Sequence, residues 1–165
     1  MKSRIDFSSR ISVRAVIAGI MVSISFMLLS LALMAALGIW NYNLNELSSA
    51  GSAFWISATL AWAMSLYCAG LVAALGSRSK NSIKGVLNAL AASCGSYLLF
   101  GMTFLLFAPG PLDSLLSAAN PQFFLRGFLG DVFAFGAGIY GGVVGARFEQ
   151  HTFHKEARKV AHYST

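Results

Sequence analysis

Residues 13–37 read VRAVIAGIMVSISFMLLSLALMAAL, and this stretch decides the class of the protein. Its only charged residue is Arg14, at the amino-terminal edge. A helix needs about 20 predominantly apolar residues to cross the hydrocarbon core of a bilayer. The run is also longer than the roughly 7–15 apolar residues of a secretory signal peptide. We therefore expect a membrane-spanning helix here, with a cleaved leader as the alternative.

Three more stretches of the 165-residue chain share this apolar character, at residues 53–75, 85–107 and 123–146. Apolar residues make up 56% of the sequence and charged residues only 11%, against roughly 25% charged in soluble proteins. A soluble fold of this size could not bury so much apolar surface. The sequence predicts an all-α integral membrane protein, a four-helix bundle that forms one membrane domain over residues 1–165 in a lipid bilayer.

The distribution of lysine and arginine predicts the orientation. Eleven of the twelve basic residues lie at the amino terminus, around the loop between the second and third spans, or in the tail at 147–165, and Arg126 is the exception. The positive-inside rule then places both termini in the cytoplasm, in a bacterial inner membrane. The basic residues form no continuous patch, so nucleic acid is not expected as a partner. The tail mixes aromatic and basic residues and is expected to form a short helix on the anionic inner leaflet.

Two pairs of segments along the chain read alike. Residues 14–19 (RAVIAG) and 84–89 (KGVLNA) open the first and third spans. Residues 69–78 (AGLVAALGSR) and 137–147 (AGIYGGVVGAR) close the second and fourth spans, with one residue inserted. The pattern indicates two tandem helical hairpins of the same topology, related by an axis along the membrane normal. Chance similarity between apolar helices is the alternative interpretation.

The fourth span carries small residues at the spacing with which helices pack in membranes. Small side chains let two backbones approach closely, and a repeat of about four residues keeps them on one flank of the helix. This flank either closes the bundle of its own chain or faces another subunit. It is longer than one helix crossing needs, which motivates the second interpretation. The predicted packing residues are Gly130, Ala134, Gly138, Gly141, Gly142 and Gly145.

Ionisable residues inside a span are costly and mark candidate functional sites. Asp131 lies about two turns into the fourth helix, near the predicted outer interface, and Arg126 precedes it by about a turn. The two residues either anchor the helix at the interface or give Asp131 a proton- or cation-linked role. Asn88 in the third span is expected to hydrogen-bond across helices. It is joined by Ser93, Ser96 and Thr103, which do not form the dense chain of a proton path.

These segments resemble a widespread family of small, uncharacterised bacterial four-helix membrane proteins. In that family a Trp-Arg-Ala-type motif enters the first helix, and residues 13–15 (VRA) correspond to it with Val in place of the aromatic residue. The family's second helix begins Trp-aliphatic-Ser, as residues 55–57 (WIS) do. Its third helix follows a basic turn with a glycine and a histidine; Gly85 fits, and Asn88 takes the place of the histidine. The resemblance implies fold and topology but no reaction.

The sequence contains no Gly-rich phosphate loop, no nucleophile with its base, and no zinc or haem spacing. We therefore expect no enzymatic activity, no cofactor and no metal. The soluble parts are too small for a separate activity. We expect a structural or accessory subunit that packs against other membrane subunits, or a second copy, through its glycine-rich fourth helix. The alternative is a small oligomeric transporter or channel, with Asp131, Asn88 and the serines of the second and third spans along its route.

Overall fold

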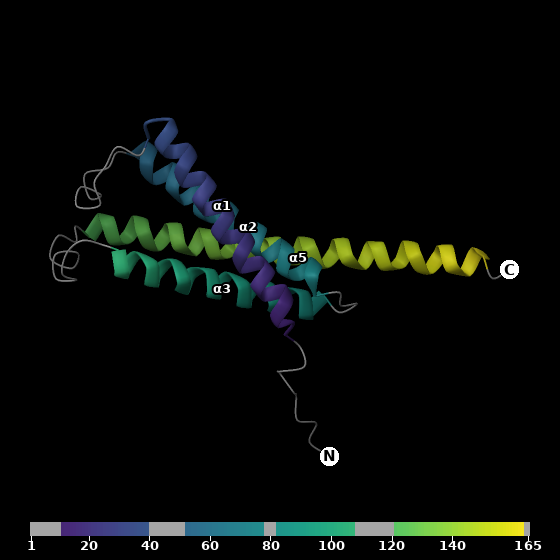
Figure 1. Cartoon of the computed structure of the whole chain (residues 1–165). Coiled ribbons are helices and arrows are strands. Elements are labelled where there is room, and N and C mark those ends of the chain that lie inside the picture. Colours follow the sequence, from purple (N-terminus) through teal and green to yellow (C-terminus); the bar gives the residue numbers. More distant parts are fainter. Residues whose placement is uncertain (1–10, 40–51, 78–81, 108–120, 164–165) are drawn as a thin grey trace, which may run out of the picture.

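The structure is a computed structural model that describes residues 11–39, 52–77, 82–107 and 121–163. Every described segment is helical, and each helix is long and apolar enough to cross a membrane. The all-α prediction is confirmed, and the chain is a multi-pass membrane protein. Figure 1 shows the four helices, which are α1 (Val13–Ala36), α2 (Ser52–Gly76), α3 (Ser82–Phe107) and α5 (Pro121–Tyr163).

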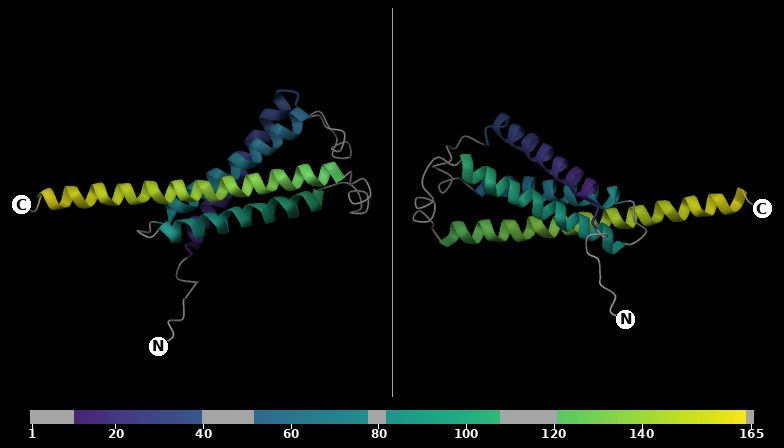
Figure 2. Two further views of the ribbon diagram at one scale, coloured as in Figure 1. Left: turned by 180° about the vertical axis from the view of Figure 1, so that it is seen from behind. Right: turned by 60° about the horizontal axis from the view of Figure 1, so that its bottom comes forward.

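Helix α2 is the centre of the bundle and packs against α1, α3 and α5. The α1–α2 hairpin crosses the α3–α5 pair obliquely, and the pairs diverge towards the end where α1 stops and α2 starts (Figures 1 and 2). Helices α1 and α3 also touch, whereas α1 and α5 make at most marginal contact within the described residues. Helix α5 therefore meets the rest of the chain through α2 and α3.

Helix α5 is much longer than the predicted fourth span. It has 43 residues, which at about 1.5 Å per residue gives roughly 65 Å, about twice the thickness of a hydrocarbon core. The helix continues well past the ends of the others (Figure 1). The prediction of a separate short helix in the tail at 147–165 is wrong, because α5 continues without a break to Tyr163. The end of the membrane span at residue 146 stays a prediction. No glycine or proline occurs between Gly145 and Tyr163, so nothing in the sequence interrupts the helix.

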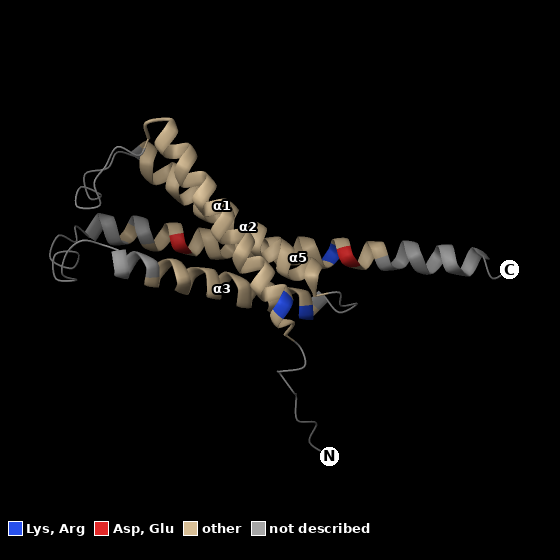
Figure 3. Cartoon of the chain, viewed as in Figure 1, with Lys and Arg blue, Asp and Glu red and all other residues tan. Residues whose placement is uncertain are grey.

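The basic residues whose side chains are described gather at one end of the bundle (Figure 3). Arg14 and Lys84 lie in the first turns of α1 and α3. Arg147 follows Ala146 of α5, and a Cβ on Gly85 would lie 3.0 Å from the Ala146 Cβ. We call this the basic end. It is also the end from which α5 projects towards the carboxyl terminus.

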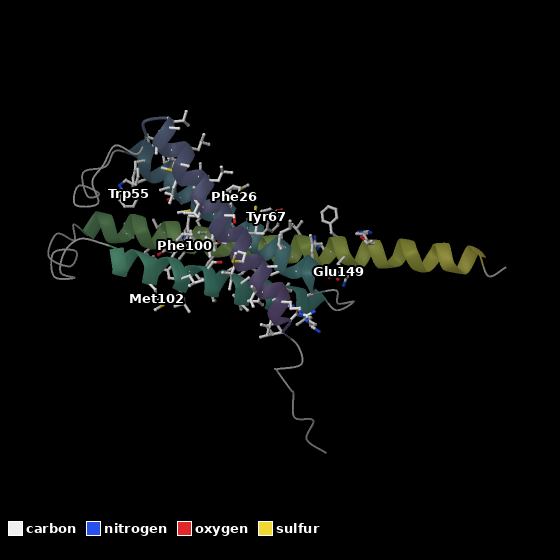
Figure 4. The ribbon with its side chains drawn as sticks, in the orientation of Figure 1. Phe26, Trp55, Tyr67, Phe100, Met102 and Glu149 are labelled. Atoms are coloured by element: carbon white, nitrogen blue, oxygen red, sulfur yellow. The ribbon has the colours of Figure 1, made fainter. Side chains whose placement is uncertain are left out.

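The interior of the bundle consists of small side chains. The largest fully buried side chains are Leu66, Asn88 and the serines Ser23, Ser65, Ser93 and Ser96. Large apolar residues point outwards instead, and Met102, labelled in Figure 4, is 61% exposed. This arrangement suits lipid, which solvates large apolar groups while small residues bring helices together.

Positions that the hairpin repeat makes equivalent meet across the bundle. A Cβ on Gly70 in α2 would meet the carbonyl oxygen of Gly138 in α5, its counterpart in the second hairpin. Leu66 and Ala134, which share the same offset, are packed in one buried cluster. A two-fold axis brings equivalent residues into mutual contact at the interface it passes through. The pairing of Gly70 with Gly138 and of Leu66 with Ala134 is the pattern that a two-fold axis between α2 and α5 would produce.

The contact inside each hairpin is also repeated. A Cβ on Gly19 would lie 3.0 Å from the Ala73 Cβ in the first hairpin, and a Cβ on Gly142 would meet the Ala89 Cβ in the second. The alignment of residues 14–19 with 84–89 makes Gly19 equivalent to Ala89. The alignment of residues 69–78 with 137–147 makes Ala73 equivalent to Gly142 if Gly141 is taken as the inserted residue. The symmetry is incomplete, because α2 packs on α3 whereas the equivalent pair, α1 and α5, does not pack comparably in the described residues.

Candidate functional site

The glycine-rich flank of α5 packs inside its own chain. Along α3, three close contacts recur every four residues: Gly85 with Ala146, Ala89 with Gly142, and Ser93 with Gly138. Along α2, a Cβ on Gly141 would meet the carbonyl oxygen of Tyr67, and one on Gly145 would lie 2.8 Å from that of Leu71. The flank thus serves two helices at once, which accounts for its length. The interpretation that it faces another subunit does not fit this arrangement.

The remaining predicted packing residues of α5 follow the same pattern. Ala134 is fully buried, and a Cβ on Gly130 would lie 3.2 Å from the Thr59 Oγ1 of α2. Gly136 differs, because nothing lies within 4 Å of the Cβ it would carry. Gly136 therefore marks the side of α5 that faces away from the bundle.

Two serines join α1 to α2 near the middle of both helices. The Ser23 and Ser65 hydroxyl oxygens lie 2.7 Å apart, and the Ser65 hydroxyl also donates to the Ser23 carbonyl oxygen at 2.9 Å. Because the Ser65 hydrogen is used on that carbonyl, the Ser23 hydroxyl is the donor between the two side chains. Both residues are fully buried.

Two further serines are buried on α3. Ser93 and Ser96 are fully buried, and neither hydroxyl has a hydrogen-bond partner among the described residues. Helices α1 and α3 approach each other at Gly19 and Ala92, where a Cβ on Gly19 would lie 3.0 Å from the Ala92 Cβ. Ser23 and Ser96 each come one turn after this contact in their own helix. Leaving a buried hydroxyl unsatisfied costs about 1–3 kcal/mol. We call the four residues Ser23, Ser65, Ser93 and Ser96 the central serine layer.

Asn88 lies between this layer and the basic end. Its Oδ1 accepts a hydrogen bond of 2.8 Å from the backbone N–H of Ser12, the residue that precedes α1. The predicted hydrogen bond from Asn88 to another helix segment is therefore present. Asn88 is fully buried, and its Nδ2 has no hydrogen-bond partner among the described residues.

Asp131 is held by a tyrosine. The Tyr97 hydroxyl of α3 donates to the Asp131 Oδ2 at 2.9 Å. The Tyr97 ring packs against Phe135 and Trp62, with centroid separations of 5.1 and 6.0 Å. Asp131 is seven residues from Gly138, about 10 Å along the axis of α5, towards the end opposite the basic end. The predicted partner Arg126 belongs to α5, but its side chain lies outside the described residues.

Sequence reasoning missed Glu149. This residue is only 8% exposed and lies where α5 leaves the bundle (Figure 4). It follows Gly142 by seven residues and Gly145 by four, a helical spacing that puts it on the same flank as Asp131 and Gly138. That periodicity was the available signal, but Glu149 lies beyond residue 146, where the predicted span ends, and was assigned to the tail. Asp131 and Glu149 are 18 residues apart, about 27 Å along one helix.

The two carboxylates thus bracket the bundle-facing flank of α5, and neutral groups lie between them along α3. From Asp131 towards Glu149, these groups are Tyr97, Ser96, Ser93 and Asn88. We call this set, with the two carboxylates, the polar file. Within the described residues, no group of three or more His, Cys, Asp and Glu could hold a metal ion. No family model, curated protein or solved structure matches the chain.

Proposed function

We propose that this protein is a small, non-enzymatic transport subunit that moves a proton or another small monovalent cation across the membrane. The observation that carries the proposal is the placement of Asp131 and Glu149. Both belong to α5, both lie on its bundle-facing flank, and about 27 Å separates them, close to the roughly 30 Å of a hydrocarbon core. Carboxylates inside a bundle commonly mark ion pathways and proton relays.

The groups between the carboxylates suit a small cation. Hydroxyl and amide side chains can each accept or donate a hydrogen bond, and the first of these groups, the Tyr97 hydroxyl, donates to Asp131. The bundle is tightly closed at its centre, where a Cβ on Gly138 would meet the Ser93 hydroxyl. Passage therefore requires the helices to separate, as in a transporter or gated channel. From the distribution of basic residues we also propose that the basic end faces the cytoplasm across a bacterial inner membrane, which would put Asp131 on the outer side.

The experiment is a flux assay with the purified chain in liposomes that contain a pH-sensitive dye. A potassium gradient with valinomycin supplies the driving force, and sodium or choline in the outer buffer separates proton from cation movement. We expect flux above that of empty liposomes, and its loss in Asp131→Asn and Glu149→Gln. Tyr140→Phe, which alters a residue 64% exposed on α5, is the matched control. Wild-type flux equal to that of empty liposomes, or full flux in Asp131→Asn, would contradict the proposal.

The structure of α1 favours a second role, that of an accessory subunit in a larger membrane complex. Only Ala15, Gly19, Ser23 and Met34 of its 24 residues are buried. Its outer side carries large apolar residues such as Leu29 and Leu33, and helices of another subunit could replace lipid there. Since the glycine flank of α5 is occupied internally, α1 is the surface that this role would use.

Purification from native membranes in mild detergent tests the second role. The particle mass and the co-purifying proteins are determined together. A defined heteromeric complex, cross-linked through a cysteine introduced at Leu29, supports the accessory role. A particle that contains this chain alone contradicts it.

A further inference from the structure

The starts of α1 and α3 lie together at the basic end. The Asn88 side chain fixes this contact, because its Oδ1 accepts the backbone N–H of Ser12 at 2.8 Å. Lys84 precedes Asn88 by about one turn of α3, and Arg14 follows Ser12 by two residues. Two basic side chains, one from each helix, therefore flank the same contact (Figure 3).

This surface is positively charged and lacks an acidic group of its own. The first turns of α1 and α3 contain no acidic residue. Arg14 is exposed and Lys84 is half-buried. Among the carboxylates whose side chains are described, Glu149 is the one at this end, and it is buried, with 8% of its surface exposed. Within the described residues, the surface between the two helix starts thus presents two cations and no exposed carboxylate.

The start of α1 also has more hydrogen-bond donors than the described residues can accept. The first N–H groups of a helix have no acceptor within it, and the Ser12 side chain makes no capping bond. The Nδ2 of Asn88, whose amide lies against Ser12, has no partner among the described residues. Unused donors and the positive end of the helix dipole both favour an anion beside this helix start.

The depth of this surface selects a phospholipid as the anion. Arg14 and Lys84 are at the first residues of two candidate membrane spans, which is the depth of the lipid headgroups. Exposed apolar residues continue from Arg14 along the same side of α1 into the membrane. Ile17 and Met21, three and seven residues further on, are 54% and 58% exposed. A ligand with an anionic head and apolar chains matches both parts of the surface.

We propose that Arg14 and Lys84 bind the phosphate of one anionic phospholipid, with its acyl chain along Ile17 and Met21. A guanidinium donates two parallel hydrogen bonds to a phosphate, and a lysine adds a compact charge. Arg14 belongs to the first hairpin and Lys84 to the second, so the lipid joins the two hairpins. The inference goes beyond the proposed function, because this lipid stabilises the bundle whether or not the protein transports ions.

Native mass spectrometry of the full-length chain in a neutral detergent tests the proposal. Phosphatidylglycerol and phosphatidylcholine with the same acyl chains are added separately, and we expect tighter binding of the first phosphatidylglycerol. Arg14→Gln and Lys84→Gln should each weaken that binding about ten-fold, the effect of losing one charge-assisted hydrogen bond. Arg147→Gln removes an exposed charge at the same end from α5 and should leave it unchanged. Equal binding of the two lipids, or an equal loss in all three variants, would overturn the proposal.

Thermal unfolding gives a second measurement and separates a lipid from a free phosphate. A ligand that binds the native state raises the Tm, so phosphatidylglycerol should stabilise the wild type and Arg147→Gln more than Arg14→Gln. Arg14→Lys keeps the charge and should be stabilised more than Arg14→Gln. Glycerol 3-phosphate has an anionic phosphate without acyl chains, and an equal rise in Tm with it would overturn the assignment to a lipid. Neither measurement requires flux, so failure of the transport proposal leaves both results unaffected.

Discussion

The backbone of Gly70 in α2 lies directly against that of Gly138 in α5, so that a Cβ on Gly70 would meet the Gly138 carbonyl oxygen. The same Cβ would lie 3.1 Å from the amide nitrogen of Gly142. Backbone groups of α2 thus face backbone groups of α5 at Gly70, and no side chain lies between them that could move aside. A larger residue at Gly70 has to displace α5, and one at Gly138 has to displace the Ser93 side chain or the helix that carries it.

Gly138→Leu is therefore expected to destabilise the single chain. Overpacking of a closed interior costs about 1–3 kcal/mol, and here the neighbours are the Ser93 side chain and Leu66. A lower Tm in detergent is the predicted result. Gly136→Leu on the opposite side, where nothing lies within 4 Å, is the matched control and should unfold like the wild type. An unchanged Tm combined with a smaller particle on a native gel would show that the flank joins subunits instead.

The Ser23–Ser65 contact is expected to contribute measurably to stability. Hydrogen bonds between membrane helices average about 0.6 kcal/mol in double-mutant cycles, with a maximum near 1.7 kcal/mol. Unfolding free energies of Ser23→Ala, Ser65→Ala and the double variant should give a coupling in this range, since the pair makes two bonds. Ser25→Ala in place of Ser23→Ala should show no coupling to Ser65. Additive effects of Ser23→Ala and Ser65→Ala would argue against the contact.

Tyr97→Phe isolates the hydrogen bond to Asp131. The substitution removes the hydroxyl that donates at 2.9 Å and keeps the ring that packs on Trp62 and Phe135. We expect the fold to survive, the infrared band of the Asp131 carboxyl group to shift, and flux to fall. Tyr140→Phe removes an exposed hydroxyl on α5 and should change neither quantity. An unshifted carboxyl band would mean that the two groups do not bond.

Asn88→Leu is expected to release the start of α1. The Asn88 side chain accepts the backbone N–H of Ser12, and the first N–H groups of a helix have no partner within it. Loss of the bond should cost about 1–2 kcal/mol and speed hydrogen exchange at Ser12. Leu90→Ala on the exposed side of α3 provides the comparison. Unchanged exchange at Ser12 would contradict this anchoring role.

Removal of residues 153–165 should leave the bundle intact. The part of α5 beyond Glu149 runs past the ends of the other helices (Figure 4), so the truncated protein should keep its Tm. Circular dichroism should show a loss of helix in proportion to the missing residues of α5. A large drop in Tm would mean that the extension folds back onto the bundle.

Several structural features follow from local properties of the sequence alone. The start and end of the α1 span, the helical character of the other spans and the small residues of α5 could all be predicted. In lipid every backbone polar group has to bond within its own helix, so a run of about 20 apolar residues fixes a helix wherever it occurs. The continuation of α5 to Tyr163 was not predicted, because apolarity indicates where contact with lipid ends and not where the helix ends.

Only the tertiary structure decided what each helix face contacts. In water, an apolar stripe reveals the buried side of a helix, but both the lipid-facing and interior sides of these helices are apolar. Small residues mark a contact without naming the partner, so the assignment of Gly138 to α2 and α3, rather than to another subunit, required the structure. The same holds for Tyr97 with Asp131 and for the central serine layer, because each joins residues from different helices. The sequence determined the membrane-spanning helices through their solvation in lipid, and the crossing of those helices determined which polar groups meet.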